Sequence, residues 1–252
     1  MLIAQVTDPH LDGTDITRQR LLDVANALTG TTTPIDLLIV SGDVVQAAAF
    51  EDDDERAIAE YRFAHNALAR IAPMAWCPGN ADAATYNVAL RELFPGTSGT
   101  RMRVDAGEVT ILMLDSRVEG ELRGHLDDAA LAWLDGELAA TSAPAIIALH
   151  HPPVMIGHPV FDTLRLDNAG ALEAVVRRHP RVTAILFGHT HSAIATQFAG
   201  VPAFGAPGVH SSGQRPWDAR EGASLIDPSA PPAYAVHRLD ASGLTSIPVV
   251  LT

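Results

Sequence analysis

Five short motifs along the chain carry side chains of the kinds that bind metal ions. In chain order they are Asp8-Pro9-His10, Gly42-Asp43, Gly79-Asn80, His150-His151 and Gly188-His189-Thr190-His191. Carboxylate, amide and imidazole donors without thiolates suit Mn, Fe, Zn or Co rather than Ca, and they argue against a structural zinc site. A lone histidine is more often a surface or packing residue, so the prediction of a metal site depends on all five motifs together.

Elements that could position these motifs are readily predicted. Apolar runs rich in Ile, Val and Leu indicate buried strands at 2–7, 36–41, 74–77, 109–115, 145–149 and 182–187. Helical patterns lie between them at 17–29, 55–71, 83–93, 127–140 and 168–178. Alternating strands and helices predict an α/β fold with helices covering a sheet. Ligands of such sheets collect beyond the carboxyl ends of the strands, which is where the five motifs fall.

Spacing and glycine content within the motifs support this interpretation. Asp8 and His10 are separated by one residue, as are His189 and His191, so each pair points to one side of a strand end. The second, third and fifth motifs begin with glycine. Glycine allows a tight turn and a close approach of the backbone to a cluster or its ligand.

The pattern changes after His191. Short apolar runs there predict strands of a second sheet of antiparallel character at 195–198, 202–204, 233–239 and 243–250. The stretch 207–232, rich in Gly, Ser and Pro, is interpreted as an ordered loop over one end of the sheets. The acidic run 51–55 predicts a solvated loop and a first helical turn. We expect one domain over 1–252, with 192–252 completing the second sheet.

Composition limits the functions that the chain could have. A length of 252 residues, 47% of them hydrophobic, is sufficient for a large core. The net charge of -13 disfavours broad binding of nucleic acid or of an anionic membrane, although bound metal ions could still attract a small anion. With one cysteine, Cys77, no intrachain disulfide is expected. No basic N-terminal region or apolar run of membrane-spanning length is seen, so we expect a cytoplasmic protein.

The five motifs resemble those of the calcineurin-like metallophosphoesterases. Within that superfamily the chain looks most like the class III cyclic nucleotide phosphodiesterases and the glycerophosphodiesterases, through about residue 204, and Gly188-His189-Thr190-His191 is the most specific element. The resemblance implies a four-layer αββα sandwich of two mixed sheets flanked by helices. It also implies a small phosphate-ester substrate, no nucleic-acid polymer or membrane partner, and a homodimer whose contact lies in 192–252.

The same resemblance implies a ligand set for two divalent or mixed-valence metal ions, drawn from Mn, Fe, Zn or Co. One ion would be held by Asp8, His10, Asp43 and His191. The second would be held by Asp43, Asn80, His150 and His189, with Asp43 bridging. His150 is preferred to His151 because it follows the apolar run directly and has Pro152 at the family's His-x-Pro spacing. His151 would then orient a ligand.

Two such ions, about 3.5–4 Å apart, can hold a bridging hydroxide as nucleophile and stabilise phosphate oxygens during in-line displacement. We therefore expect metal-dependent hydrolysis of small phosphodiesters, with 3′,5′-cyclic nucleotides as the first candidates. The alternatives are another phosphodiester such as a glycerophosphodiester, a phosphomonoester, or a metal- and phosphate-binding protein with reduced turnover.

One position departs from the family that the chain resembles. Where family members commonly have His after Gly-Asn, this chain has Ala81. That His is thought to contact phosphate and to help protonate the leaving group, and general acid catalysis contributes roughly 10²–10⁴-fold. Three explanations compete: Ala81 is native to a branch without His, it is an engineered replacement, or another residue such as His210 supplies the proton. Asn80 and His210 are therefore our catalytic candidates.

The remaining histidines lack the spacing of metal ligands. We interpret them as surface or packing residues: His65, His125, His158, His179 and His237.

Overall fold

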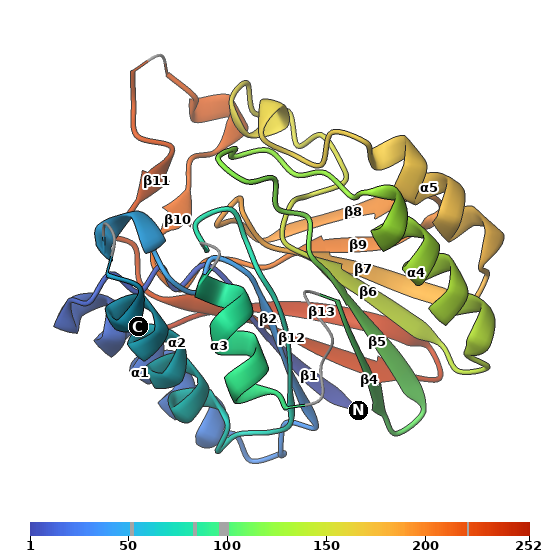
Figure 1. Ribbon diagram of the computed structural model, residues 1–252, viewed down its shortest axis with the longest axis horizontal. Coiled ribbons are helices and arrows are strands. Elements are labelled where there is room, and N and C mark those ends of the chain that lie inside the picture. Colours follow the sequence, from blue (N-terminus) through green and yellow to red (C-terminus); the bar gives the residue numbers. More distant parts are fainter. Residues whose placement is uncertain (51–52, 83–84, 96–100, 221) are drawn as a thin grey trace.

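The computed structural model describes residues 1–50, 53–82, 85–95, 101–220 and 222–252. Two β-sheets pack face to face and helices cover their outer faces (Figure 1). The five-stranded sheet has the order β13-β12-β1-β2-β3 and the six-stranded sheet the order β4-β5-β6-β7-β9-β8. Both sheets contain parallel and antiparallel pairs. The predicted αββα sandwich of two mixed sheets is therefore confirmed.

The five-stranded sheet places three parallel strands beside a C-terminal hairpin. Its strands are β1 (Leu2–Val6), β2 (Leu37–Ser41), β3 (Met74–Cys77), β12 (Ala233–Asp240) and β13 (Gly243–Val250). The helices on its outer face are α1 (Asp15–Thr29), α2 (Asp54–Leu68) and α3 (Thr85–Leu93). A short 3₁₀ helix, η1 (Ala47–Phe50), precedes α2.

The six-stranded sheet is covered by two helices (Figure 1). Its strands are β4 (Met102–Ala106), β5 (Val109–Leu114), β6 (Ala145–Leu149), β7 (Val182–Phe187), β8 (Ile194–Phe198) and β9 (Val201–Gly205). The helices are α4 (Asp128–Ala140) and α5 (Ala169–Arg178). The remaining elements are short: η2 (Phe161–Thr163), β10 (Ser212–Gly213), η3 (Pro216–Asp218) and β11 (Ile226–Asp227).

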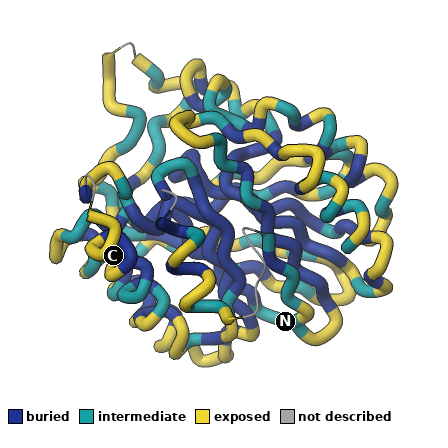
Figure 2. Tube along the Cα trace, viewed as in Figure 1, coloured by how far each residue is buried: buried dark blue, intermediate teal, exposed yellow. Residues whose placement is uncertain are grey.

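Alternation along the strands divides the core into two parts. On β6, Ile146 and Ala148 join the core that also contains Ile3 of the first sheet, whereas Ile147 and Leu149 pack in the core beneath α4 and α5. Successive side chains of a strand point to opposite faces, so a strand with both faces covered is apolar at every position. Figure 2 shows the result, with buried strands inside and exposed residues along the helices and loops.

Helix boundaries follow the predicted start signals. Asp127 caps α4, and its carboxylate accepts a hydrogen bond from the Ala130 N–H at 2.6 Å. Asp53 caps α2 in the same way, which confirms the first helical turn predicted at the end of the acidic run. Residues 51–52 of that run, and 83–84 of the predicted helix 83–93, lie outside the described residues.

One expectation is corrected by the sheet topology. The segment 192–252 does not complete only the second sheet, because β8 and β9 extend the six-stranded sheet whereas β12 and β13 extend the five-stranded one. β12 pairs antiparallel with β1, the strand farthest from it in the chain. The apolar alternation of a strand shows that it has a buried face but does not identify its partner. The segment 207–232 contains β10, η3 and β11 rather than loop alone, with residue 221 outside the described part.

No helix in the described part of the chain is long and apolar enough to cross a lipid bilayer.

A polar network lies between the apolar faces of the two sheets. The side-chain amide of Gln5 on β1 donates to Ser41 Oγ on β2 at 2.8 Å and to the Phe187 carbonyl on β7 at 3.0 Å. Its Oε1 accepts from Nε2 of His237 on β12 at 3.0 Å. Gln5 and His237 are fully buried. Burial disfavours the charged imidazolium and lowers the pKa of His237 to about 4.

This lowered pKa predicts a loss of stability in acid. The unfolded chain binds the His237 proton with a pKa of about 6.5, so the contribution of neutral His237 is complete above that pH and is lost as pH falls towards 4. The expected loss is about 3 kcal/mol in the free energy of unfolding. Urea titrations in chelator at several pH values should show a smaller pH dependence for His237→Gln than for the wild type. Equal slopes in the two proteins would contradict the prediction.

Candidate metal centre

The structure brings together all seven of the predicted donors. Each follows one of the parallel strands: Asp8 and His10 follow β1, Asp43 follows β2, Asn80 follows β3, His150 follows β6, and His189 and His191 follow β7. The predicted placement beyond the carboxyl ends of the strands is therefore observed. The donors form two groups that share Asp43.

The first group contains two carboxylates and two imidazoles. His10 Nε2 lies 3.2 Å from His191 Nε2 and 3.5 Å from Asp43 Oδ2. Asp8 Oδ1 lies 3.4 Å from His191 Nε2 and 3.7 Å from His10 Nε2. Asp8 is fully buried, and its Oδ1 has no hydrogen-bond partner.

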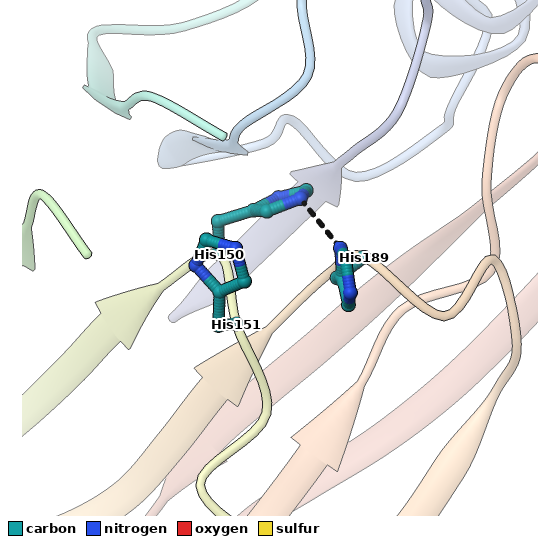
Figure 3. Close-up of side chains that lie close together, drawn as sticks. All are labelled: His150, His151 and His189. Atoms are coloured by element: carbon teal, nitrogen blue, oxygen red, sulfur yellow. Dashed lines mark hydrogen bonds between the residues drawn. The ribbon is translucent and has the colours of Figure 1, made fainter. Parts of the chain in front are cut away.

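The second group is centred on His150. Its Nε2 lies 3.2 Å from Asn80 Oδ1, 3.2 Å from His189 Nδ1 and 3.3 Å from Asp43 Oδ2. Figure 3 shows the rings of His150 and His189 facing each other from two different strand ends. Asp43 Oδ2 thus lies within reach of both groups.

These distances fit the coordination of a divalent ion. Bonds from nitrogen and oxygen donors to such ions are about 2.0–2.2 Å, which sets neighbouring donors about 3.0–3.5 Å apart. Most spacings in both groups fall in or near this range. A buried acceptor without a donor, such as Asp8 Oδ1, is also unfavourable unless a cation or proton satisfies it. The donor set therefore fits two metal ions.

Backbone strain is concentrated at the same residues. Among the described residues other than glycine, six have positive φ, and five of them are predicted donors: Asp8 (55°), His10 (45°), Asp43 (51°), His189 (69°) and His191 (50°). The sixth is Ala199. Such conformations are uncommon and persist where the surrounding structure enforces them, often at functional sites.

All three of the predicted glycines are required by close contacts. A Cβ at Gly79 would overlap Asp43 Oδ1 and lie 2.5 Å from the Asp43 nitrogen. Gly42 has φ +96°, and a Cβ there would lie 2.5 Å from His150 Nδ1 and 2.7 Å from the Gly79 nitrogen. A Cβ at Gly188 would overlap Thr7 Oγ1 and lie 2.9 Å from the Ser41 carbonyl oxygen. The predicted close approach of the backbone is confirmed at all three positions.

Three of the four imidazoles are oriented through the ring nitrogen that faces away from the cluster. His150 Nδ1 donates to the Ser41 carbonyl at 2.8 Å, so its Nε2 lone pair faces the donors. Nδ1 of His10 contacts Gln46 Oε1 at 2.8 Å, and Nδ1 of His191 contacts Ser211 Oγ at 2.7 Å. Gln46 and Ser211 were not predicted from the sequence, because Gln and Ser carry no metal-site signal and their partners are distant along the chain.

Asp82 joins the turns that carry Asp43 and Asn80. Its buried carboxylate accepts from the backbone N–H groups of Val44 (3.2 Å), Val45 (3.0 Å) and Gly79 (2.9 Å) and from the Tyr61 hydroxyl (2.8 Å). The sequence analysis did not assign it a role. Its position two residues after Asn80 in Gly79-Asn80-Ala81-Asp82 was the available signal.

The electrostatics of the cluster favour a positive charge at its centre. Burial would raise the pKa of Asp8, but His191 and His10 outweigh it and lower the pKa to about 2. For Asp43, burial is likewise outweighed by His150, and its pKa is lowered. Burial alone would lower the pKa of His10 and His150, but the nearby carboxylates raise it to about 9 in each. Metal binding would displace these protons, which links metal affinity to pH.

The two neighbouring histidines after β6 have different contacts. His150 contacts Asp43 and Asn80, whereas Nδ1 of His151 contacts Ser116 Oγ at 2.8 Å. The His151 ring lies 4.9 Å from that of His189 between centroids, in the position shown in Figure 3. Burial and then His189 lower the pKa of His151 well below its usual value, so it is neutral. Nε2 of His151 is buried without a hydrogen-bond partner, and His151 forms a group of three imidazoles with His150 and His189 whose nitrogens lie within 4.8 Å of one another. The preference for His150 as the ligand stays a prediction.

Ala81 and His210, the two positions considered for proton donation, contact different donors of the cluster. The backbone N–H of Ala81 donates to Asp43 Oδ1 at 2.7 Å, so this position supports Asp43 without a side chain. The His210 N–H donates to the Asp8 carbonyl at 3.0 Å, and its ring centroid lies 5.5 Å from that of His10. Burial and His10 lower the pKa of His210 to about 4.

A cavity of about 790 Å³ adjoins both donor groups, with His10 and Asn80 in its wall, and includes Ala81. The other polar side chains in its wall are Gln46, Asp82, Asn87, Asp115, Arg117 and Glu119, and the apolar ones include Leu122. Arg117 is held by Asp115, by the Asp82 carbonyl and by Asn87. His210 is not among the described residues that line this cavity.

Comparison with known proteins identifies the family. A model of the calcineurin-like phosphoesterases matches residues 1–193. The chain is 31% identical to the glycerophosphodiester phosphodiesterase GpdQ of Enterobacter lignolyticus, over 94% of this chain and 87% of that protein. It is 32% identical to a 3′,5′-cyclic-nucleotide phosphodiesterase of Nostoc, over 81% of this chain and 77% of that one. The cyclic AMP phosphodiesterase CpdA of Escherichia coli is 36% identical over 66% and 58%.

Among solved structures, a dimetal phosphatase from Danio rerio shares the fold, with a TM-score of 0.73 and 14% sequence identity over 100% of this chain and 99% of that one. The chain belongs to the calcineurin-like phosphoesterases. The family and these relatives support a hydrolase of phosphoric esters that uses divalent metal ions.

The contacts of Gly188 predict a large effect of one added methyl group. Gly188→Ala should displace Thr7 or Ser41 and lower the free energy of unfolding by about 1–3 kcal/mol. Gly136→Ala in α4 is the matched control, because a Cβ at Gly136 would meet nothing within 4 Å. It should raise the free energy of unfolding by about 0.5–1 kcal/mol. Urea titrations compare the two variants, and an equal effect would show that the contacts at Gly188 are relaxed without cost.

Proposed function

We propose that this chain is a two-metal phosphodiesterase. The observation that carries the proposal is the pair of donor groups that share Asp43, with spacings of 3.2–3.7 Å. In this assignment Asp8, His10, Asp43 and His191 hold one ion. Asp43, Asn80, His150 and His189 hold the other, and His151 supports His189.

When bound, two such ions supply a hydroxide nucleophile near neutral pH and neutralise charge on the phosphate. The residues of the chain provide the geometry for this chemistry. Gln46, Ser41 and Ser211 hold three imidazoles with their free nitrogens towards the cluster. Asp82 keeps the turns that carry Asp43 and Asn80 together.

The cavity favours a substrate with one negative charge. Three carboxylates, Asp82, Asp115 and Glu119, line it beside one guanidinium, that of Arg117, which is paired with Asp115. Ala81 adds no imidazole where family members commonly have His. A phosphodiester carries one negative charge and a phosphomonoester up to two, so the acidic wall disfavours the monoester more. A volume of about 790 Å³ is sufficient for a nucleotide-sized molecule. We take 3′,5′-cyclic nucleotides as the first candidate substrates, as in the names of the Nostoc and Escherichia coli relatives.

Glycerophosphodiesters are the second candidate, because GpdQ matches more of the chain than either of these relatives. In both cases residues 1–252 would act as one unit, since the segment after His191 adds strands to both sheets. A homodimer with its contact in 192–252, and a cytoplasmic location, stay predictions.

Activity should depend on added metal. Chelator-treated protein should not hydrolyse bis(p-nitrophenyl) phosphate, and Mn²⁺ should restore hydrolysis as it fills the two donor groups. The release of p-nitrophenolate measures the rate. If the protein binds two ions but does not hydrolyse the ester with added Mn, Fe, Zn or Co, the hypothesis of an enzyme is rejected. A metal- and phosphate-binding protein is then favoured.

A matched pair of variants controls this test. His150→Ala removes a donor that contacts both Asp43 and Asn80, so it should abolish binding of one ion. His151→Ala removes a neighbouring imidazole that contacts Ser116 instead, so it should weaken metal binding by about 10–100-fold without lowering the number of ions bound. The reverse result would exchange the roles of the two residues.

The missing imidazole should limit turnover only where the leaving group needs a proton. Ala81→His should accelerate hydrolysis of cyclic AMP, whose leaving group is an alkoxide, by up to about 10²-fold. It should change hydrolysis of bis(p-nitrophenyl) phosphate little, because p-nitrophenolate leaves without protonation. Steady-state rates on the two substrates measure this difference.

Two further variants complete the comparison. Ala48→His places an imidazole elsewhere in the wall of the same cavity and should accelerate neither substrate. If His210 already supplies the proton, His210→Ala should slow the hydrolysis of cyclic AMP but not that of bis(p-nitrophenyl) phosphate. No gain from Ala81→His on either substrate would show that the missing imidazole does not limit turnover.

A further inference from the structure

Gln5 is a polar residue on the face of β1 that packs against the other sheet. β1 pairs with β12 so that Ile3 lies opposite His237 and Gln5 opposite Ala235. Directly opposed residues of an antiparallel pair share a face of the sheet. Gln5 and His237 therefore project to the same side and meet diagonally, with no exposed surface on either.

The amide of Gln5 joins the ends of two strands from different sheets. Nε2 donates to Ser41 Oγ at the end of β2 and to the Phe187 carbonyl at the end of β7. The next residues are glycines, and the residues after those are Asp43 and His189. One planar NH₂ group thus sets the separation of the two turns that carry these donors.

The contacts continue from these strand ends to the donors. The Ser41 carbonyl accepts from His150 Nδ1 at 2.8 Å and from Thr7 Oγ1 at 3.2 Å. The Thr7 hydroxyl also lies 2.7 Å from Asp8 Oδ2, which accepts from the His189 N–H at 3.1 Å. A shift of Ser41 would therefore move a hydrogen bond of His150.

The Phe187 carbonyl and His237 together determine which way the Gln5 amide points. Its Nε2–H donates to Gln5 Oε1, which leaves the two N–H groups directed at Ser41 and Phe187. With the amide reversed, its oxygen would face the Phe187 carbonyl oxygen, and two acceptors would be buried against each other. In this arrangement both polar atoms of the Gln5 amide have partners, whereas Nδ1 of His237 is buried without one. Hydrogen bonds between buried side chains favour one arrangement.

We propose that Gln5 and His237 form a brace, a buried pair of positioning residues that holds the ends of β2 and β7 at the separation required by the metal donors. This inference rests on the proposed two-metal site. It gives the C-terminal strand β12 a role in a site whose donors all precede residue 192. Gln5 and His237 touch neither substrate nor metal and act through Ser41 and Phe187.

Metal affinity tests the brace without relying on turnover. Gln5→Met keeps the length of the side chain but removes its hydrogen bonds. Calorimetric titration of the full chain with Mn²⁺ should show about 10–100-fold weaker binding of at least one ion. The absorption spectrum of the Co²⁺-loaded variant should also change, and kcat should fall with little change in KM.

Two controls separate positioning from a general loss of stability. Ile3→Val removes a methyl group from the same face of β1 and should lower the thermal midpoint while Mn²⁺ affinity stays within about twofold. His237→Gln can still donate to Gln5 Oε1 and should retain affinity, whereas His237→Leu cannot and should lose it. If Gln5→Met does not fold, this pair at position 237 decides the question.

The result that would overturn the brace is a Gln5→Met protein, or a His237→Leu protein, with lowered stability but unchanged Mn²⁺ affinity and Co²⁺ spectrum. A wild type that binds two ions and hydrolyses none of the esters would reject the proposed function alone. The brace would then still be judged by its effect on affinity.

Discussion

The constraint on which the site depends is the burial of two ionised carboxylates, Asp8 and Asp43, beside imidazoles at the ends of parallel strands. Charges in a low-dielectric interior are unfavourable unless opposite charge compensates them. Here the opposite charge comes from protonated His10 and His150, whose pKa values are raised to about 9, or from bound cations. Many local features of the fold follow from holding these groups together, including positive φ at five donors and the close contacts of Gly42 and Gly188.

Much of this could be predicted from the sequence because the signals are local. An apolar run indicates a strand, and a donor just after the run must lie at the end of that strand in the sheet. The helices also began within a few residues of their predicted starts, since capping residues such as Asp127 act over one turn. The seven donors that the structure brings together were proposed from this pattern together with the family resemblance. Their role as ligands, and the preference for His150 over His151, stay predictions.

The rest depends on contacts between residues that are distant in the chain. Gln5 and His237 are 232 positions apart in the chain. From the sequence alone, Gln5 is a single polar residue in a predicted strand, and its partners cannot be predicted. Gln46 and Ser211 orient His10 and His191 through side chains that no motif marks. The division of 192–252 between the two sheets has the same origin, because β12 could be recognised as a strand but its pairing with β1 could not.

The backbone at Ala81 explains how the site can lack an imidazole and still assemble. The contact that this position makes with Asp43 comes from its N–H group, at 2.7 Å, and any residue except proline supplies that group. Asp82 holds the turn through its side chain, and a change at residue 81 does not remove its contacts. Loss of a side chain at residue 81 therefore removes a group that faces the cavity and leaves the donors in place. In the proposed mechanism, assembly of the metal centre and protonation of the leaving group would be separable, and only the second would depend on the side chain after Asn80.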